Sequence, residues 1–286
     1  VLETYAGLAA LLFKKQFKRV PYVLTLQSGD PDTWLRLRTW FWYPWYRQIY
    51  TRANKMTAIS QWLAKRARRY GYKGEIKIIP NGVDVEHFSQ SMTKADQNFI
   101  RSSWGVAESA FVVVTASRLV HKNGVDTLID SLRFLPRDIV LVIAGAGEDE
   151  AKLKEKVKSE KEKIGDRVIF LGHINHGSLP RVLKAADVFA RASRSEGLGN
   201  AFLEAMAARL PVIGTKVGGI IDFIKDQETG LLVAPENSVA LAGVIKKLYK
   251  DKNLQQSLAL NGESLVKAKY DWPEIAAAYK LVYESF

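Results

Sequence analysis

The sequence predicts an α/β fold that is divided into two units, each built around a parallel sheet. From residue 111 onward, short apolar runs alternate with amphipathic stretches, and a briefer alternation of the same kind precedes residue 90. Apolar runs of about four to seven residues are typical of strands that are buried on both faces of a parallel sheet. Helices between such strands make a doubly wound α/β domain, here over roughly residues 93–260.

The later unit contains six expected strands interleaved with six expected helices. The strands are 111–117, 139–145, 167–172, 187–193, 211–217 and 230–235. The helices are 124–135, 148–164, 178–186, 200–209, 219–226 and 237–251. In such open sheets ligands bind outside the carboxyl ends of the strands, so we expect the site where strands give way to loops and helices.

The first ninety residues predict a smaller unit of the same kind. The expected strands are 20–27, 55–60 and 75–80, and the expected helices are 6–17 and 61–71. Because three strands leave an exposed edge, we expect a preceding segment to be missing or another element to cover that edge. We therefore predict a partial N-terminal domain over 1–90, a C-terminal domain over 91–265, and over 266–286 a helix that packs back toward the N-terminal domain.

Two prolines and a glycine indicate how the units join. The segment "PNGVD" (80–84) has the composition of an interdomain hinge, and we expect Gly82 to adopt a positive φ there. The last helix is expected to begin through Pro273, because proline is favoured in the first turn of a helix.

Composition limits the class of protein. The 286 residues are 47% hydrophobic and 25% charged, which fits a globular chain with a core, and the lack of cysteine excludes disulfides and thiolate chemistry. No apolar run approaches the roughly 18 residues of a bilayer-spanning helix. The net charge is +12, and residues 1–90 hold 15 Lys/Arg against 6 Asp/Glu. Anionic lipid, anionic sugar or nucleic acid each explain such a basic excess.

The stretch "SRSEGLGNAFLEAM" (193–206) carries the clearest signal of a site. Gly197 and Gly199 allow the backbone to approach a ligand closely. The helix that begins near Asn200 directs free N–H groups and the positive end of its dipole at that ligand, an environment that suits a diphosphate. Glu204 lies one turn into this helix among apolar residues, where a carboxylate needs hydrogen-bond donors, and the vicinal diol of a ribose supplies two. Glu196, in the loop, is placed to reach a sugar beyond the diphosphate.

Cations and a second glycine pair are expected beside this stretch. Arg118 and Lys122 follow the first strand of the C-terminal unit, and both side chains bind phosphate oxygens. Gly218 and Gly219 follow another strand and allow a further close approach of the backbone.

These motifs together resemble the retaining, nucleotide-sugar-dependent glycosyltransferases of family 4, which have the GT-B fold of two Rossmann-like domains. The resemblance rests on "EGLGNAFLEAM", "LPVIGTKVGGIIDFI", "TGLLV", "SRLVHKNGVDTLI" and "IIPNGVDVEHF", which occur in the family's order and extend over nearly the whole chain. It implies a metal-independent hexosyltransferase that retains configuration and needs no cofactor. It also implies an acceptor-side N-terminal domain and a C-terminal domain that binds the nucleotide sugar.

The resemblance further implies a role for each matching position. Glu204 would bind the donor ribose, Glu196 the transferred sugar, and Arg118 with Lys122 the diphosphate leaving group. The remaining implied donor-binding positions are Gly197, Leu198, Gly199, Asn200, Gly218 and Gly219, together with His173 and Ile174 at the base. No metal ligand is expected.

Three departures from the family pattern qualify this reading. Gln27 stands where the family usually has a histidine; glutamine can donate a hydrogen bond to the sugar but cannot act as a base. Asn123 stands directly before Gly124, where the family usually has its lysine, and Lys122 lies one position earlier. The glycine-rich first loop of the N-terminal domain is absent from the sequence.

An aromatic and basic stretch suggests where an acceptor is met. Residues 34–50 hold four of the seven tryptophans, and with the basic segments 14–19 and 65–69 they favour an anionic membrane surface and a glycan or lipid-linked acceptor. The competing reading is a helix that buries the tryptophans against the sheet. No nucleic-acid motif is present. We therefore expect a cytoplasmic enzyme, peripheral at the inner face of the membrane.

Two other functions fit the same residues. One is a nucleotide-sugar-binding partner subunit with weak catalysis, and the other is a different GT-B enzyme such as a nucleotide-sugar epimerase. The sequence specifies neither the base and sugar of the donor nor the acceptor, the linkage or the oligomeric state.

Overall fold

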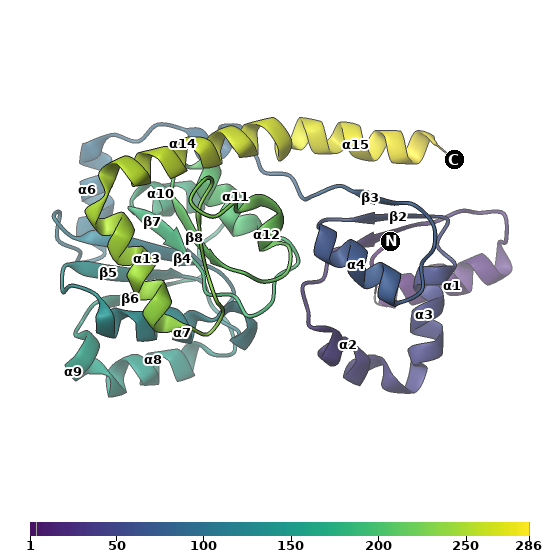
Figure 1. Cartoon of the computed structure of the whole chain (residues 1–286), viewed down its shortest axis with the longest axis horizontal. Coiled ribbons are helices and arrows are strands. Elements are labelled where there is room, and N and C mark those ends of the chain that lie inside the picture. The colour runs from purple at the N-terminus through teal and green to yellow at the C-terminus, as the bar shows by residue number, and fades with distance from the viewer. Residues whose placement is uncertain (4, 286) are drawn as a thin grey trace.

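The computed structural model describes residues 1–3 and 5–285 and contains two parallel sheets (Figure 1). The first has three strands in the order β1-β2-β3, and the second has six in the order β6-β5-β4-β7-β8-β9. Every pairing of neighbouring strands is parallel, which confirms the predicted α/β class. The strands are β1 (Val23–Leu26), β2 (Lys55–Ala58), β3 (Ile76–Ile78), β4 (Phe111–Ala116), β5 (Ile139–Ala144), β6 (Val168–Gly172), β7 (Val188–Ala190), β8 (Val212–Thr215) and β9 (Leu231–Val233).

The helices surround these sheets. Those of the first unit are α1 (Tyr5–Gln16), α2 (Asp32–Thr39), the 3₁₀ turn η1 (Trp40–Trp42), α3 (Tyr43–Thr51) and α4 (Gln61–Arg69). Those of the second are α5 (Val85–Ser89), α6 (Lys94–Ser103), η2 (His121–Asn123), α7 (Val125–Ser131), η3 (Leu132–Phe134), α8 (Glu150–Ser159), α9 (Lys161–Ile164), α10 (Leu179–Lys184), α11 (Asn200–Ala207), α12 (Ile220–Phe223), α13 (Ser238–Lys250) and α14 (Lys252–Lys269). The last helix is α15 (Trp272–Glu284). No helix within 1–3 and 5–285 is both long and apolar enough to cross a bilayer.

Helices cover both faces of the six-stranded sheet. Alternate residues of β4 enter different cores: Val112 and Val114 pack with α10 and α11, whereas Val113 packs with α7 and α13. This alternation is the pleat of a strand that is buried on both sides, and it explains why the run "FVVVTA" contains no polar residue before Thr115. The strand order reverses direction between β4 and β7, so the crevice for a ligand lies at their carboxyl ends.

The chain crosses between the two units twice, through residues 80–84 and 270–272. At this crossing the Val83 N–H donates to the Tyr270 carbonyl at 2.7 Å. Beyond it, α15 runs over the N-terminal sheet, where Ile275 and Val282 pack against Val23 and Ile79 (Figure 1).

Gly82 does not have the positive φ expected of a hinge turn; residues 80–84 form no turn, and Val83 makes an isolated bridge to Asp271. A Cβ at this position would lie 2.6 Å from the Trp272 ring. Glycine is therefore required for the close approach of α15, and not for a left-handed backbone.

Lys65, Arg68 and Arg69 of the basic segment 65–69 are exposed, but Arg66 is not. Arg66 is completely buried, and its guanidinium donates to the carbonyls of Ser28 and Asp30. Arg69 pairs with Asp32 at 2.6 Å. The prediction was wrong for Arg66 because its acidic and carbonyl partners come from distant parts of the chain.

Candidate functional site

The carboxyl ends of the two sheets face each other, and two loops touch at their centre. Loop 191–199 follows β7, and loop 27–31 follows β1. The Ser195 hydroxyl donates to the Gly29 carbonyl at 2.6 Å across this contact. A Cβ on Gly29 would overlap the backbone of Gly197, so the two loops can meet this closely only because both positions are glycine.

The loop after β8 packs against the same contact between loops 191–199 and 27–31. The Gly219 N–H donates to the Glu196 carbonyl at 3.1 Å, and a Cβ on Gly218 would overlap that carbonyl. Gly218 also has a φ of +55°, which favours glycine. The structure thus brings together the two glycine pairs that the sequence placed in separate loops.

The start of α11 points into this contact. Gly199 adopts a φ of +101° immediately before the helix, and buried Leu198 precedes it. The Asn200 side-chain carbonyl accepts from the Asn81 amide at 3.2 Å, and the Asn81 carbonyl accepts from Gln27 at 3.4 Å. Gln27 is exposed at the end of β1, and an amide relay connects it to the first turn of α11.

Glu204 lies on the inner side of α11, and its side chain is 15% exposed. Burial raises the pKa of this carboxyl, and the nearby charges of His176 and Arg191 partly oppose the rise. The Glu204 Oε1 lies 3.5 Å from His176 Nε2. A half-buried acid with one weak partner retains free acceptor capacity, as a ribose-binding carboxylate would need.

Glu196 is held by an arginine that sequence reasoning missed. Arg191 Nη2 lies 2.6 Å from Glu196 Oε2 and donates to Asn123 Oδ1 at 2.7 Å. The other oxygen of Glu196 accepts from the Gly197 N–H at 3.2 Å. Arg191 lies within the apolar run 187–193; a charge inside a buried strand sequence was the signal available for it.

The two predicted cations lie in different surroundings. The Arg118 side chain is exposed after β4, while its carbonyl accepts from the Asn123 amide at 2.6 Å. Lys122 instead pairs with Asp30 at 2.8 Å, across the interface between the two units. Arg118 is thus open to a ligand, whereas a phosphate would have to compete with Asp30 for Lys122.

His173 and Ile174 follow β6 at the other end of the crevice. His173 is exposed, and Ile174 is half-buried against the core. His176, in the same loop, stacks on His87 with ring centroids 5.7 Å apart. Within residues 1–3 and 5–285, no group of three or more His, Asp or Glu side chains is placed to hold a metal ion.

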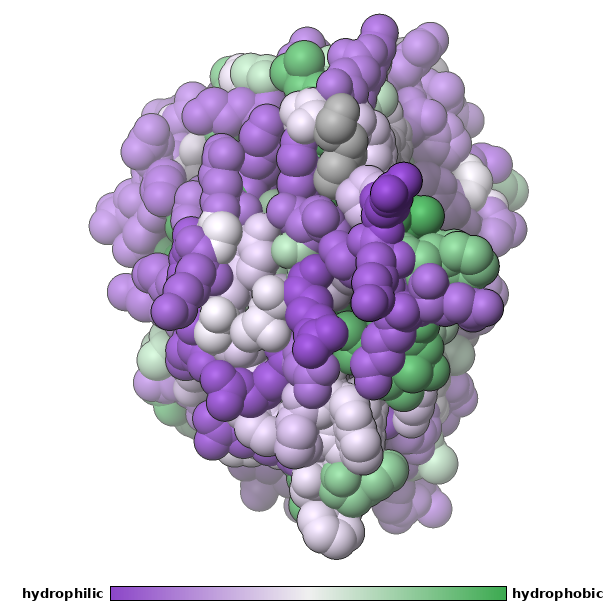
Figure 2. All heavy atoms as spheres, turned by 90° about the vertical axis from the view of Figure 1, so that its right-hand side faces the viewer, coloured by the Kyte–Doolittle hydropathy of each residue, from purple (hydrophilic) through white to green (hydrophobic). Residues whose placement is uncertain are grey.

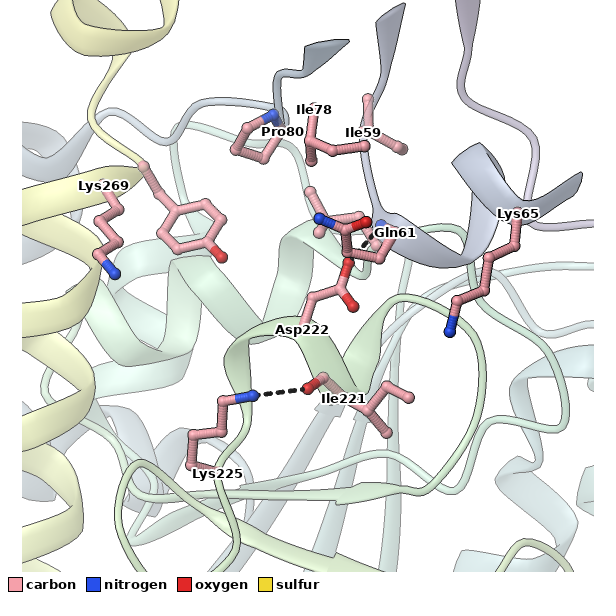
Figure 3. A pocket seen from close by; sticks show the side chains of 11 residues that line it. Ile59, Gln61, Lys65, Ile78, Pro80, Ile221, Asp222, Lys225 and Lys269 are labelled. Atoms are coloured by element: carbon pink, nitrogen blue, oxygen red, sulfur yellow. Dashed lines mark hydrogen bonds between the residues drawn. The ribbon is translucent and has the colours of Figure 1, made fainter. Parts of the chain in front are cut away.

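A cavity of about 530 Å³ lies where the two units meet near the crossing of the chain (Figure 3). Asp222 of α12 reaches the first turn of α4, where its carboxylate accepts from the Gln61 N–H at 2.6 Å. Lys65, Lys225 and Lys269 surround the opening. Of the predicted site residues only Leu198 lines this cavity, so it adjoins the candidate site without containing it.

Comparisons with known proteins identify a family for each of the two units. The family described as Glycosyl transferases group 1 matches residues 96–265, and the family described as Glycosyltransferase Family 4 matches residues 2–87. The first match spans the six-stranded sheet and the candidate donor residues, and the second spans the three-stranded sheet.

Curated relatives are similar but longer. An uncharacterized glycosyltransferase of Methanocaldococcus jannaschii is 30% identical over 73% of this chain and 54% of its own length. The GDP-mannose-dependent monoacylated alpha-(1-6)-phosphatidylinositol monomannoside mannosyltransferase of Corynebacterium glutamicum is 30% identical over 79% of this chain and 61% of its own length. The aligned part of this chain thus spans between about half and three fifths of these relatives.

Solved structures share the arrangement of both sheets. HepE of Anabaena in complex with UDP-glucose superposes with a TM-score of 0.86 and 25% identity, over 98% of this chain and 76% of that one. Sucrose-phosphate synthase of Thermosynechococcus elongatus gives a TM-score of 0.85 and 26% identity, over 98% and 71%. Because the first family match alone covers more than half of the sequence, this chain belongs to the glycosyl transferases group 1 family, and its fold is GT-B.

Proposed function

We propose that this protein binds a nucleotide-diphosphate sugar and transfers its hexose to a glycan or lipid-linked acceptor with retention of configuration. One observation carries the proposal: Glu196 and the start of α11 lie at the contact between loops 191–199 and 27–31, and Glu204 follows one turn into α11, within the influence of the Arg191 charge. The UDP-glucose bound by HepE and the GDP-mannose used by the corynebacterial relative support a nucleotide sugar as the donor.

Each donor group has a matching protein group in this proposal. The diphosphate lies at the start of α11, near the backbone of 197–199 and 218–219, and Arg118 neutralises its charge. Glu204 accepts hydrogen bonds from the ribose hydroxyls, and Glu196 accepts from the hexose. The loop that contains His173 and Ile174 contacts the base through its backbone.

The chemistry follows from stabilising the leaving group. As the bond between the sugar and the diphosphate breaks, negative charge grows on the phosphate oxygens, where the α11 dipole and Arg118 are already oriented. The acceptor hydroxyl then attacks the same face of the oxocarbenium-like sugar and transfers its proton to the departing phosphate. Gln27 positions the sugar by hydrogen bonding and takes no proton. Neither a metal nor a cofactor is needed in this scheme.

We further propose that the N-terminal unit docks on an anionic membrane at the cytoplasmic face. Three of the four tryptophans of 34–50 are exposed and only Trp42 is buried; Trp40 and Phe41 are 73% and 68% exposed. Figure 2 views the end of the molecule formed by this unit, and pale and green spheres gather in its lower part, at the height of α2 and of the turn that follows it in Figure 1. Arg38 lies over the Trp34 ring at 4.9 Å, so aromatic and basic groups share this surface. The lysines of 14–19 add positive charge.

Donor binding by the chain tests the proposal. Titration calorimetry with UDP-glucose and GDP-mannose should give saturable binding of at least one, and Glu204→Gln should weaken it. Incubation of that donor with and without an acceptor then separates the functions. Acceptor-dependent release of the nucleotide diphosphate supports transfer. Donor binding without turnover indicates the partner subunit, and an isomerised donor without acceptor indicates an epimerase. No binding of either donor contradicts the proposal.

A further inference from the structure

Arg191 is a charged residue in a place where charge is costly. It follows β7 directly and is only 9% exposed. A guanidinium stays protonated in proteins, so its burial must be compensated by hydrogen bonds and opposite charge. The identity of its partners therefore indicates its purpose.

The other buried arginines of the C-terminal unit serve the backbone. Arg167 donates to the carbonyls of Ile164, Pro136 and Leu132, and each of its three nitrogens has a backbone partner. Arg101 donates to two further carbonyls and to Asp187, an acid remote from the candidate site. These arginines fasten loops and helix ends to the sheet.

Arg191 differs because both hydrogen bonds of its guanidinium go to side chains of the crevice. Its Nη2 reaches Glu196 Oε2 at 2.6 Å and Asn123 Oδ1 at 2.7 Å. Its Nε is buried without a hydrogen-bond partner among the described residues. The position of the guanidinium is thus set by side chains of the candidate site, and not by backbone groups of the core.

Asn123 extends this connection to the end of β4. Its amide nitrogen donates to the Arg118 carbonyl at 2.6 Å, while its oxygen accepts from Arg191. Since both ends of the buried amide are engaged, the turn that carries Arg118 and the loop that carries Glu196 are tied together through one asparagine and one arginine.

We propose that Arg191 is a positioning residue of the donor site, which anchors the Glu196 carboxylate and, through Asn123, fixes the Arg118 turn relative to it. This inference rests on the proposed function and assigns a residue that the predicted site did not include. Arg191 orients the acid expected to bind the hexose and the backbone that carries the cation expected to bind the diphosphate, without itself touching the donor.

The same guanidinium acts on Glu204 through its charge. Burial raises the pKa of Glu204, and the charges that face it, on His176 and Arg191, oppose that rise. His87 stacks on His176 from α5. Without Arg191 the pKa of Glu204 rises further, so Glu204 becomes protonated at a higher pH than in the wild type. The protonated acid can no longer accept from both ribose hydroxyls.

The test compares Arg191→Gln with Arg194→Gln in the full chain. Arg194 lies three residues away and is bound to Asp126, Glu236 and the His121 carbonyl, so its loss removes a guanidinium from the same loop, and a contact to the same turn, without touching Glu196. The measurement is the Kd of UDP-glucose and GDP-mannose between about pH 5.5 and 8. We expect Arg191→Gln to weaken binding about tenfold, the scale of one charge-assisted hydrogen bond, and to move the acid limb of binding upward in pH. Arg194→Gln should lower Tm without moving that limb.

A second pair of variants keeps the test decisive if Arg191→Gln does not fold. Arg191→Lys retains the positive charge but loses the planar set of N–H donors. It should therefore keep the pH profile of donor binding while weakening that binding. Asn123→Ala should weaken binding about threefold by loosening the guanidinium. Unchanged affinity and pH profile in the folded Arg191 and Asn123 variants would overturn this inference alone. A wild-type chain that binds neither donor overturns the proposed function and this inference with it.

Discussion

Two loops face each other across the crevice, and a buried arginine organises each of them. In the N-terminal unit, Arg66 of α4 donates to the carbonyls of Ser28 and Asp30 in the loop after β1. It also lies 2.8 Å from Asp32 and 3.5 Å from Glu3. In the C-terminal unit, the Arg191 guanidinium donates, among the described residues, to the side chains of Asn123 and Glu196.

The two arginines therefore have different roles, one in the fold and one in the candidate site. Arg66 fixes the course of a backbone, so that Gly29 can meet Gly197 closely. Arg191 fixes the position of a carboxylate that faces the crevice. Loss of Arg66 should therefore lower the stability of the fold. Loss of Glu196 or Glu204, the acids near Arg191, should weaken donor binding.

The largest expected effect is on the stability of the N-terminal unit. Arg66→Met leaves Glu3 buried without its opposite charge, although burial already raises the pKa of that acid. Breaking a buried pair in this way costs about 3–5 kcal/mol of unfolding free energy. Urea denaturation measures it. Arg69→Met, which removes a half-exposed partner of Asp32, should cost under about 1 kcal/mol. Equal losses for the two variants would show that Arg66 is not the organising residue.

Glu204→Gln should separate binding from stability. We expect donor binding to weaken about 10- to 100-fold, because a charged acceptor is lost. The folded-state pKa of Glu204 is raised, so its stabilising contribution is complete below the unfolded pKa and is lost as pH rises through the folded pKa. The variant should therefore be more stable than wild type at neutral pH, and this advantage should vanish as the pH falls to the ordinary pKa of a glutamic acid, about 4.

Glu263→Gln provides the control of opposite sign. Burial raises the pKa of Glu263, but hydrogen bonds from Lys267 and Arg209 outweigh burial and hold the pKa below its ordinary value. This variant should lose stability at neutral pH and bind donor normally. Thermal unfolding between about pH 4 and 8 compares the two variants, and a stability loss at neutral pH in Glu204→Gln would contradict the assignment.

Removal of exposed aromatic side chains should weaken membrane binding without unfolding the chain. Trp40→Ser with Phe41→Ser should lower partition onto vesicles of anionic lipid about tenfold, because both rings are exposed. Sedimentation with vesicles measures it. Phe99→Ser, at an exposed position on α6, is the matched control. Equal partition of all variants onto the vesicles would contradict the proposed docking on a membrane.

The smallest effect concerns the ion pair between the two units. A double-mutant cycle on Lys122 and Asp30 should give a coupling energy below about 1 kcal/mol, because both side chains are partly exposed. A coupling above about 2 kcal/mol would mean that this pair, and not the glycine contact, holds the units together.

The fold was largely predictable because strands buried on both faces require continuous apolar runs. All nine expected strands are present, and α11 begins at Asn200 as expected. The helices α5, α6 and α14 were not predicted, and helices over 34–50 were only the competing interpretation of that stretch. Gly82 was correctly identified as special but for the wrong reason, because its neighbour Trp272 is distant in sequence.

The candidate site was predictable where a motif is local and not where partners are distant. The segment 196–204 is local, and the structure collects its residues in one place. Arg66 looked like part of a solvated basic run because Glu3 and Asp32 are remote from it in sequence. Arg191 was hidden in an apolar run, and only the fold brings Asn123 beside it.

A crystal structure of the chain with UDP-glucose or GDP-mannose bound would test the central claim most directly. We predict the diphosphate at the start of α11 beside Arg118, and the ribose hydroxyls within hydrogen-bond distance of the Glu204 carboxylate. A donor that is bound elsewhere, with Glu204 still beside His176 and no ribose near it, would contradict the account.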